Sequence, residues 1–228
     1  MDRRDFTRLC SGMLAGAASL HASANDAGHL YPRAQITLDD GTPLSIDTLE
    51  VNDSLIFSYP YKTTPCFLVR LSASAPGNGK WSGGIGPDQS VVAFSAICSH
   101  KMSHPARPIS HINFRSDAVA YFDTQGQRHE RANVISCCSE RSVYDPLNGG
   151  SVLSGPAPVP LAAIALEVDE SGLLYATGSL GADQYDRFLT KFGFRLAMEY
   201  GVTDVRAWVG EQTVAVRSNQ FSQQQIRC

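Results

Sequence analysis

Two short segments of the 228-residue sequence combine side chains that bind transition metals. In the first, Cys98 and His100 stand two positions apart, directly after an apolar run that reads as a strand. In the second, Cys137, Cys138 and Glu140 follow another run of the same kind. These two loops are the best candidates in the sequence for a chemical site.

Other kinds of chemistry have less support. The run Gly83-Gly84-Ile85-Gly86 invites comparison with a phosphate-binding loop, but a predicted strand follows it, whereas such loops need the N-terminus of a helix. We therefore interpret it as a turn. The sequence contains no Gly-x-Ser-x-Gly nucleophile motif.

The composition is that of an ordinary globular protein, with 43% hydrophobic and 18% charged residues. Nineteen basic and 22 acidic residues give a net charge of -3, which offers no electrostatic support for a nucleic-acid partner. No stretch approaches 18 consecutive apolar residues, so we expect no membrane span unless the short N-terminal apolar segment is kept as an anchor.

The N-terminus has the three regions of an export signal in order. Arg3 and Arg4 precede a mild apolar run over residues 9–20, and Ala22-Ser23-Ala24 has the small-x-small form of a cleavage site. Paired arginines before a weak apolar run resemble the twin-arginine signal. We therefore expect residues 1–24 to be a signal peptide and the protein to be periplasmic, folded before export.

The cysteine count is informative in an oxidising compartment. Cys10 leaves with the signal, and five cysteines remain, an odd number that cannot all pair. At least one must be free, ligated or bonded elsewhere. Cys66 is predicted to be a small buried apolar residue, and His104, His111 and His129 to be loop histidines in solvent.

The elements that must position the two loops are β-strands. From about residue 30 to 178, short β-type runs alternate with Gly, Pro, Asn and Asp, and helical periodicity is absent, so we expect an all-β domain. Residues 123–127 read as a hairpin turn and 148–150 as a tight turn, whereas the proline-rich segment 155–160 must be a surface loop. The expected strands are 35–38, 54–59, 66–71, 90–97, 118–123, 132–136, 142–144, 163–168 and 173–176.

The C-terminal part differs from the rest. Asp183 and Asp186 mark a plausible helix start and Gly201 its end. Apolar residues recur between them at helical spacing: Tyr185, Phe188, Leu189, Phe192, Leu196 and Tyr200. This apolar face has two possible docking surfaces, the β domain and a partner subunit, and we expect it to dock on the β domain. Segments 205–209 and 213–216 flank Gly210-Glu211 and predict a hairpin, so residues 179–228 form an α/β extension.

The two loops resemble those of a Rieske protein. In that family, two cysteines hold one iron of a 2Fe-2S cluster and two histidines hold the other. Ser142, Tyr144 and Asp145 match the Ser-x-Tyr-Asp that follows the second loop, and Gly155-Pro156-Ala157 supplies the later Gly-Pro loop. We expect a Rieske-like domain over residues 25–178. From about residue 30 to 178 the chain looks most like the Rieske subunit of arsenite oxidase, on these further segments: Tyr31-Pro32, Phe57-Ser58-Tyr59-Pro60, Pro65-Cys66-Phe67-Leu68-Val69 and Gly83-Gly84-Ile85-Gly86-Pro87-Asp88.

The resemblance implies a ligand set with one departure. Cys98, His100 and Cys137 fall on family ligands, but Glu140 stands where the family has its second histidine. Ser142 and Tyr144 match groups that hydrogen-bond the cluster sulfurs. The disulfide that joins the two loops in many relatives would need cysteines at positions 103 and 139, and both are serine.

Glu140 leaves three possibilities open. Its carboxylate ligates iron, which is feasible because ferric iron accepts hard oxygen donors. Alternatively, Cys138, His104 or His129 completes the ligand set. In the third case the cluster is lost and the fold serves for docking.

By resemblance, the expected function is one-electron transfer. A small periplasmic subunit, not itself catalytic, would pass electrons from a large, molybdenum-containing catalytic subunit to a cytochrome or similar acceptor. The alternatives are a cluster-free structural or export-escort subunit of such a complex, and a free-standing periplasmic ferredoxin, which would be monomeric.

The export signal is tested by changing both arginines. Arg3→Lys together with Arg4→Lys should trap folded precursor in the cytoplasm, because the twin-arginine route reads the arginine pair. Cell fractionation and immunoblotting measure the distribution. Unaffected export of the double variant would contradict the assignment.

Overall fold

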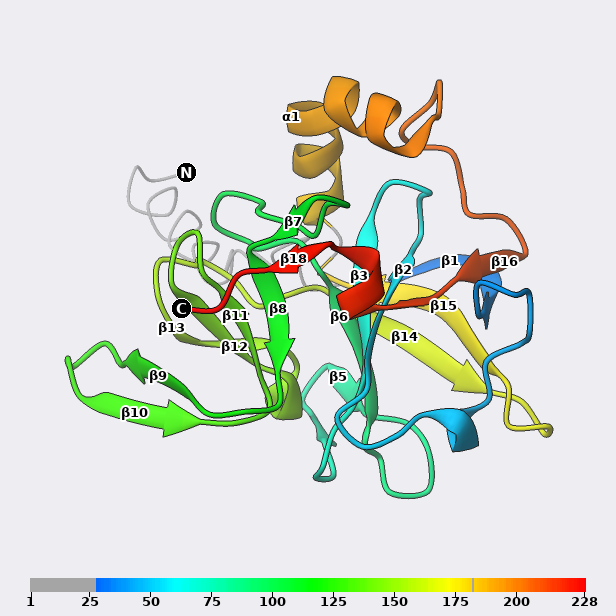
Figure 1. Ribbon diagram of the computed structural model, residues 1–228. Coiled ribbons are helices and arrows are strands. Elements are labelled where there is room, and N and C mark those ends of the chain that lie inside the picture. The colour runs from blue at the N-terminus through cyan, green and yellow to red at the C-terminus, as the bar shows by residue number, and fades with distance from the viewer. Residues whose placement is uncertain (1–27, 182) are drawn as a thin grey trace, which may run out of the picture.

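The computed structural model of the chain describes residues 28–181 and 183–228 (Figure 1). The predicted signal peptide, residues 1–24, lies outside the described residues. The fold is mostly β, as predicted, with one long helix, α1 (Asp183–Tyr200), and one short helix, α2 (Ser218–Phe221).

The largest element is an eight-stranded sheet in the order β16-β1-β15-β14-β6-β3-β2-β17. Its neighbours pair antiparallel except β1 and β16, which are parallel. The strands are β1 (Gly28–Thr37), β2 (Ser54–Ser58), β3 (Pro65–Arg70), β6 (Val91–Ser95), β14 (Ala163–Val168), β15 (Leu174–Leu180), β16 (Gln212–Val214) and β17 (Val216–Arg217).

A second sheet of four strands, in the order β13-β12-β11-β8, carries the second candidate loop. Three two-stranded ribbons complete the β structure: β4 with β5, β9 with β10, and β7 with β18. The strands are β4 (Pro76–Asn78), β5 (Trp81–Gly83), β7 (Ile109–Ser110), β8 (Ile112–Arg115), β9 (Val119–Phe122), β10 (Arg128–Arg131), β11 (Val134–Cys137), β12 (Ser142–Asp145), β13 (Ser151–Ser154) and β18 (Gln224–Gln225).

The large sheet is buried on both faces, and the alternation of its strands explains this. Along β3, Cys66 and Leu68 enter one apolar core, whereas Phe67 and Val69 enter another. Successive side chains of a strand point to opposite faces, so continuous apolar runs are typical of doubly covered strands. The second core also contains Ile135 and Tyr144 of the small sheet. This core therefore fixes the two sheets against each other.

Helix α1 covers the first core. Tyr185, Phe188, Leu189 and Leu196 are all buried there, so the predicted helix and its docking on the β domain are confirmed. Gly201 has φ +62, a left-handed conformation that ends helices and suits glycine.

The predicted hairpin at 205–209 and 213–216 is wrong. The turn at Gly210 leads the chain onto the open edge of β1, where Gln35 N–H donates to Glu211 O and β16 pairs in parallel. Strand β17 then pairs with β2, and Trp208 bridges to Tyr61. The edge strands β1 and β2 of the main sheet have unpaired backbone groups, and β16 and β17 pair with these instead of with each other. A local hairpin pattern in the sequence does not reveal such distant partners.

The loops agree better with the sequence. The 123–127 turn joins β9 and β10, Gly149 and Gly150 have positive φ, and residues 155–160 form no strand. The predicted turn at Gly83–Gly86 is only partly right: Gly83 ends β5 and Ile85 bridges to Val91, and the turn runs from Gly86 to Gln89, whose N–H donates to Gly86 O.

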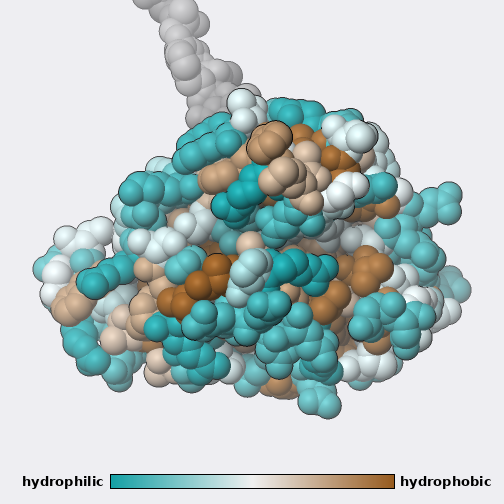
Figure 2. Space-filling model, turned by 45° about the horizontal axis from the view of Figure 1, so that its top comes forward, coloured by the Kyte–Doolittle hydropathy of each residue, from teal (hydrophilic) through white to brown (hydrophobic). Residues whose placement is uncertain are grey.

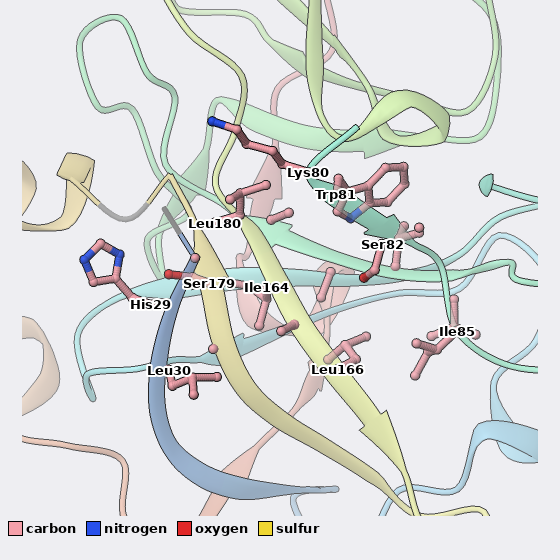
Figure 3. Close-up of a pocket in the computed structure, with 18 residues that line it drawn as sticks. His29, Leu30, Lys80, Trp81, Ser82, Ile85, Ile164, Leu166, Ser179 and Leu180 are labelled. Carbon is pink, nitrogen blue, oxygen red and sulfur yellow. The ribbon is translucent and has the colours of Figure 1, made fainter. Parts of the chain in front are cut away.

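A cavity of about 420 Å³ opens where β6 and β14 share a single residue pair (Figure 3). Trp81, Ile164 and Leu180 line it, together with Lys80 and Ser179, and none of the predicted site residues does. Figure 2 shows small hydrophobic patches separated by hydrophilic residues on the face turned toward α1. Within the described ranges, no helix is long and apolar enough to cross a bilayer.

Candidate metal centre

The first loop leaves the end of β6 and closes on itself. Met102 N–H donates to Cys98 O, and Cys98 N–H to Ser103 O, both at 2.9 Å. Met102 adopts a left-handed φ of +66 to allow this turn. The loop thereby buries Cys98 and brings His100 toward the surface.

The second loop is the turn of the β11–β12 hairpin. Cys137 and Ser142 form its last residue pair. Residue Gly155 packs so closely on it that a Cβ would lie 2.4 Å from Arg141 O, which only glycine avoids. The proline-rich loop that follows also accepts a hydrogen bond from Ser99 Oγ at Val159 O, at 2.7 Å. It therefore contacts both candidate loops.

The thiols of Cys98 and Cys137 meet between the loops, where both are buried and hydrogen-bonded to each other. Donation from Cys137, with hydrogen bonds from Tyr144 and the backbone of His100 and Lys101, lowers the pKa of Cys98 to about 6. The same thiol–thiol hydrogen bond and burial raise the pKa of Cys137. Cys98 is thus the more acidic thiol of the pair, and the thiolate is the form of cysteine that binds metal.

His100 and Glu140 face each other on the outer side of the thiols. His100 Nδ1 lies 3.6 Å from a Glu140 carboxylate oxygen, and Lys101 Nζ lies 3.1 Å from the other oxygen. The side chains of His100 and Glu140 are 29% and 23% exposed, so this half of the site borders solvent. His100 Nδ1 itself is buried and forms no hydrogen bond within the described structure.

Tyr144 and Ser142 both belong to β12, which follows the second loop. Tyr144 Oη is 3.2 Å from Cys98 Sγ and accepts a hydrogen bond from Ser99 N–H at 3.1 Å. Ser142 Oγ is buried and without a hydrogen-bond partner among the described residues. Because buried polar atoms are normally hydrogen-bonded, Ser142 Oγ and His100 Nδ1 are each able to form one further interaction.

The candidate donors on the two loops form two pairs. Among the described residues, no three Cys, His, Asp or Glu side chains gather as ligands of one metal ion. Instead, a thiol pair adjoins an imidazole–carboxylate pair. The Rieske arrangement has two thiolates on one iron and two imidazoles on the other, and the sequence resemblance puts Glu140 at the position of one imidazole.

The other candidate ligands lie elsewhere. Cys138 forms a disulfide with Cys228. His129 pairs with Asp123 in the β9–β10 ribbon at 2.8 Å and stays partly exposed. Of the four alternatives named from the sequence, only Glu140 stands beside His100.

His104 corrects the prediction of a solvated loop histidine. It is 7% exposed and packs edge-on against Phe188 of α1, with ring centroids 4.8 Å apart. Burial lowers its pKa to about 4, and the neutral ring donates from Nδ1 to Met102 O and accepts from Arg195 at Nε2. Cys66 is buried, as predicted, and its thiol lies 3.2 Å from Tyr59 O.

Sequence reasoning missed the Cys138–Cys228 disulfide. The cysteines are 90 residues apart, with Cα atoms 5.6 Å apart, a usual separation for a disulfide. The only sequence signal was the odd cysteine count, which did not identify the pair.

No protein-family model matches the sequence. The iodate reductase subunit IdrB of Denitromonas iodatirespirans is 30% identical over 185 residues, 79% of this chain and 82% of the relative. IdrB of Pseudomonas sp. (strain SCT) is 30% identical over 138 residues, 60% of this chain and 58% of the relative.

Among solved structures, the soluble domain of the Rieske protein II (soxF) from Sulfolobus acidocaldarius gives a TM-score of 0.44 at 29% identity, over 65% of this chain and 78% of that chain. The family assignment rests on the relative from Denitromonas iodatirespirans, 82% of which the match covers, together with the two loops. The chain belongs to the Rieske family, alongside the iodate reductase subunit IdrB.

Proposed function

We propose that the protein is an electron-transfer subunit of an oxidoreductase, carrying a 2Fe-2S cluster. The observation that carries this proposal is the meeting of Cys98 and Cys137 from two loops, with His100 and Glu140 beside them. In our proposal, Cys98 and Cys137 hold the inner iron, and His100 and Glu140 the outer one. When bound, the cluster supplies a site that accepts and releases one electron.

The surrounding residues have roles of their own. Tyr144 and the N–H groups of His100 and Lys101 direct hydrogen bonds to Cys98 sulfur, which favours the negative charge that an added electron brings. Ser142 Oγ is positioned to donate to a cluster sulfur, since it has no other hydrogen-bond partner within the described structure. A cluster-free module would leave this hydroxyl buried and unpaired, at a cost in stability.

Glu140 makes the proposed site more negative. Two thiolates and two neutral imidazoles give a neutral oxidised cluster, whereas a carboxylate in place of one imidazole gives -1. Adding an electron to a negative site is harder, so the potential should be lower. Lys101 offsets little of this because its side chain is 60% exposed. Such a pair contributes about 1 kcal/mol at most, on the order of 40 mV for one electron.

Electrons would enter and leave through the His100 side. A shallow depression of about 500 Å³ lies there between His100, Met102 and the outer face of α1, including Arg187 and Lys191. His100 is therefore the proposed ligand within reach of a docked redox partner, whereas both thiols are buried.

The partner we propose is a large catalytic oxidoreductase subunit. The IdrB relatives are subunits of an iodate reductase, and the sequence resemblance to the arsenite oxidase small subunit favours a molybdenum-containing enzyme. A cytochrome or similar carrier would be the second redox partner of this subunit. In a reductase, electrons pass from the carrier through the small subunit to the catalytic subunit. This is the reverse of the direction expected from the resemblance to an oxidase. We further propose that the assembly is periplasmic, exported by the twin-arginine route.

The cysteine ligands are tested by conservative substitution. Cys98→Ser and Cys137→Ser should each remove two irons and two acid-labile sulfides per chain, because thiolates hold the inner iron. Iron and sulfide assays on protein from its native host measure this. The matched control is Cys66→Ser, a buried thiol in the other core, which should keep both. Full iron content in either ligand variant would contradict the proposal.

The role of Glu140 is tested by the midpoint potential. Glu140→His should raise it by more than about 40 mV, the most that loss of an exposed ion pair produces, and should make it depend on pH through the new imidazole. Protein-film voltammetry at several pH values measures both effects. Glu130→Gln, which removes an exposed carboxylate of β10, is the control and should leave the potential unchanged. An unchanged potential and spectrum in Glu140→His and Glu140→Ala would exclude ligation by Glu140.

A further inference from the structure

The last eleven residues form a strap along the segment that continues the first loop. This C-terminal strap, residues 218–228, comprises α2, β18 and the chain end. Strand β18 pairs in parallel with β7, and Gln223 N–H and Ile226 N–H donate to Arg107 O and Ser110 O, both at 2.8 Å. Ser222 Oγ donates to Ala106 O at 2.7 Å. The strap is therefore fixed to residues 106–110, directly after the first loop.

The other end of the strap is covalently bonded to the second loop. Figure 1 shows the red C-terminal segment passing β7 and ending beside β11. There Cys228 forms the disulfide with Cys138, the residue between Cys137 and the turn that carries Glu140. Cys138 N–H also donates to His111 O at 2.7 Å. The second loop and the segment that directly follows the first loop are thus tied to one C-terminal segment.

No covalent bond joins the two loops directly. Positions 103 and 139 are serines, and Ser103 contributes only a side-chain hydrogen bond to Cys137 sulfur. The Cys138–Cys228 disulfide is the one covalent tie on the second loop among the described residues. Loss of this tie would leave residues 138–141 held by hydrogen bonds and packing alone.

We propose that the Cys138–Cys228 disulfide is a positioning device that holds the second loop in its ligand-binding conformation, and that its reduction releases the cluster. The inference rests on the proposed function. Residues that orient metal ligands typically change metal affinity 10- to 100-fold when lost. Glu140 and Cys137 flank Cys138 closely enough that movement of its backbone moves both.

The disulfide is accessible to a reductant. Cys228 is exposed and Cys138 half-buried. A dithiol breaks the S–S bond by forming its own disulfide, and each protein sulfur gains a proton, so two electrons and two protons pass to the protein. Because the strap then keeps its hydrogen bonds and the packing of Phe221 but no covalent tie to the second loop, a thiol-reducing environment would lower cluster retention.

The test measures cluster lifetime in full-length mature protein. Wild type, Cys228→Ser and the control Cys66→Ser are exposed anaerobically to an iron chelator, and the loss of visible absorbance is followed. Cys228→Ser should lose its cluster at least about tenfold faster than wild type and Cys66→Ser. Its potential and electron paramagnetic resonance spectrum should also shift, because Glu140 and Cys137 are repositioned.

A second measurement needs no substitution. Wild type treated with dithiothreitol and desalted anaerobically should match Cys228→Ser, and the same treatment should not alter Cys228→Ser further. Equal lifetimes and spectra in reduced wild type, untreated wild type and Cys228→Ser would overturn the inference while leaving the proposed function intact. Wild type isolated without iron would instead overturn the proposed function, and this inference with it.

Discussion

The meeting of two thiols from two different sheets is the constraint on which the site depends. Cys98 follows β6 of the large sheet, and Cys137 ends β11 of the small one. Their separation is set by the apolar core between the sheets, where Phe94 packs with Ile135 and Tyr144. Tyr144 also reaches across, placing its hydroxyl 3.2 Å from Cys98 Sγ. A change in the packing of this core should therefore change the relative position of the two thiols, because a densely packed protein interior transmits small displacements.

The outer half of the site is governed by charge and exposure instead. His100 and Glu140 border solvent, and Lys101 pairs with the carboxylate. An arrangement with buried thiols and an exposed imidazole favours electron exchange through the histidine side while protecting the sulfur ligands from water. In our account, Glu140 adjusts the potential of the site, and the disulfide at Cys138 preserves its shape. These are separate effects, because one acts through ligand charge and the other through loop position.

The sequence predicted local features well and long-range ones poorly. Short apolar runs identified most strands of the large sheet but only β11 and β12 of the small one, and the 3.6-residue spacing from Tyr185 to Tyr200 identified α1, because periodicity reflects burial directly. The loop residues Cys98, His100, Cys137 and Glu140 were proposed as ligands because their two loops resemble those of a Rieske protein, and the structure brings these two loops together. The pairing of β16 with β1 and the Cys138–Cys228 disulfide were missed, since both join segments far apart in sequence. Burial of His104 depends on α1 packing over it, which no local pattern encodes.

The central claim is a cluster held by two thiolates, one imidazole and one carboxylate. Pulsed electron paramagnetic resonance of the reduced wild-type protein tests it most directly, because strongly coupled nitrogens report the number of histidine ligands on the outer iron. The account predicts a half-integer-spin signal that is coupled to a single histidine nitrogen. This nitrogen coupling should disappear in His100→Ala. Coupling to two histidine nitrogens, or protein from the native host that gives no such signal on reduction, would contradict it.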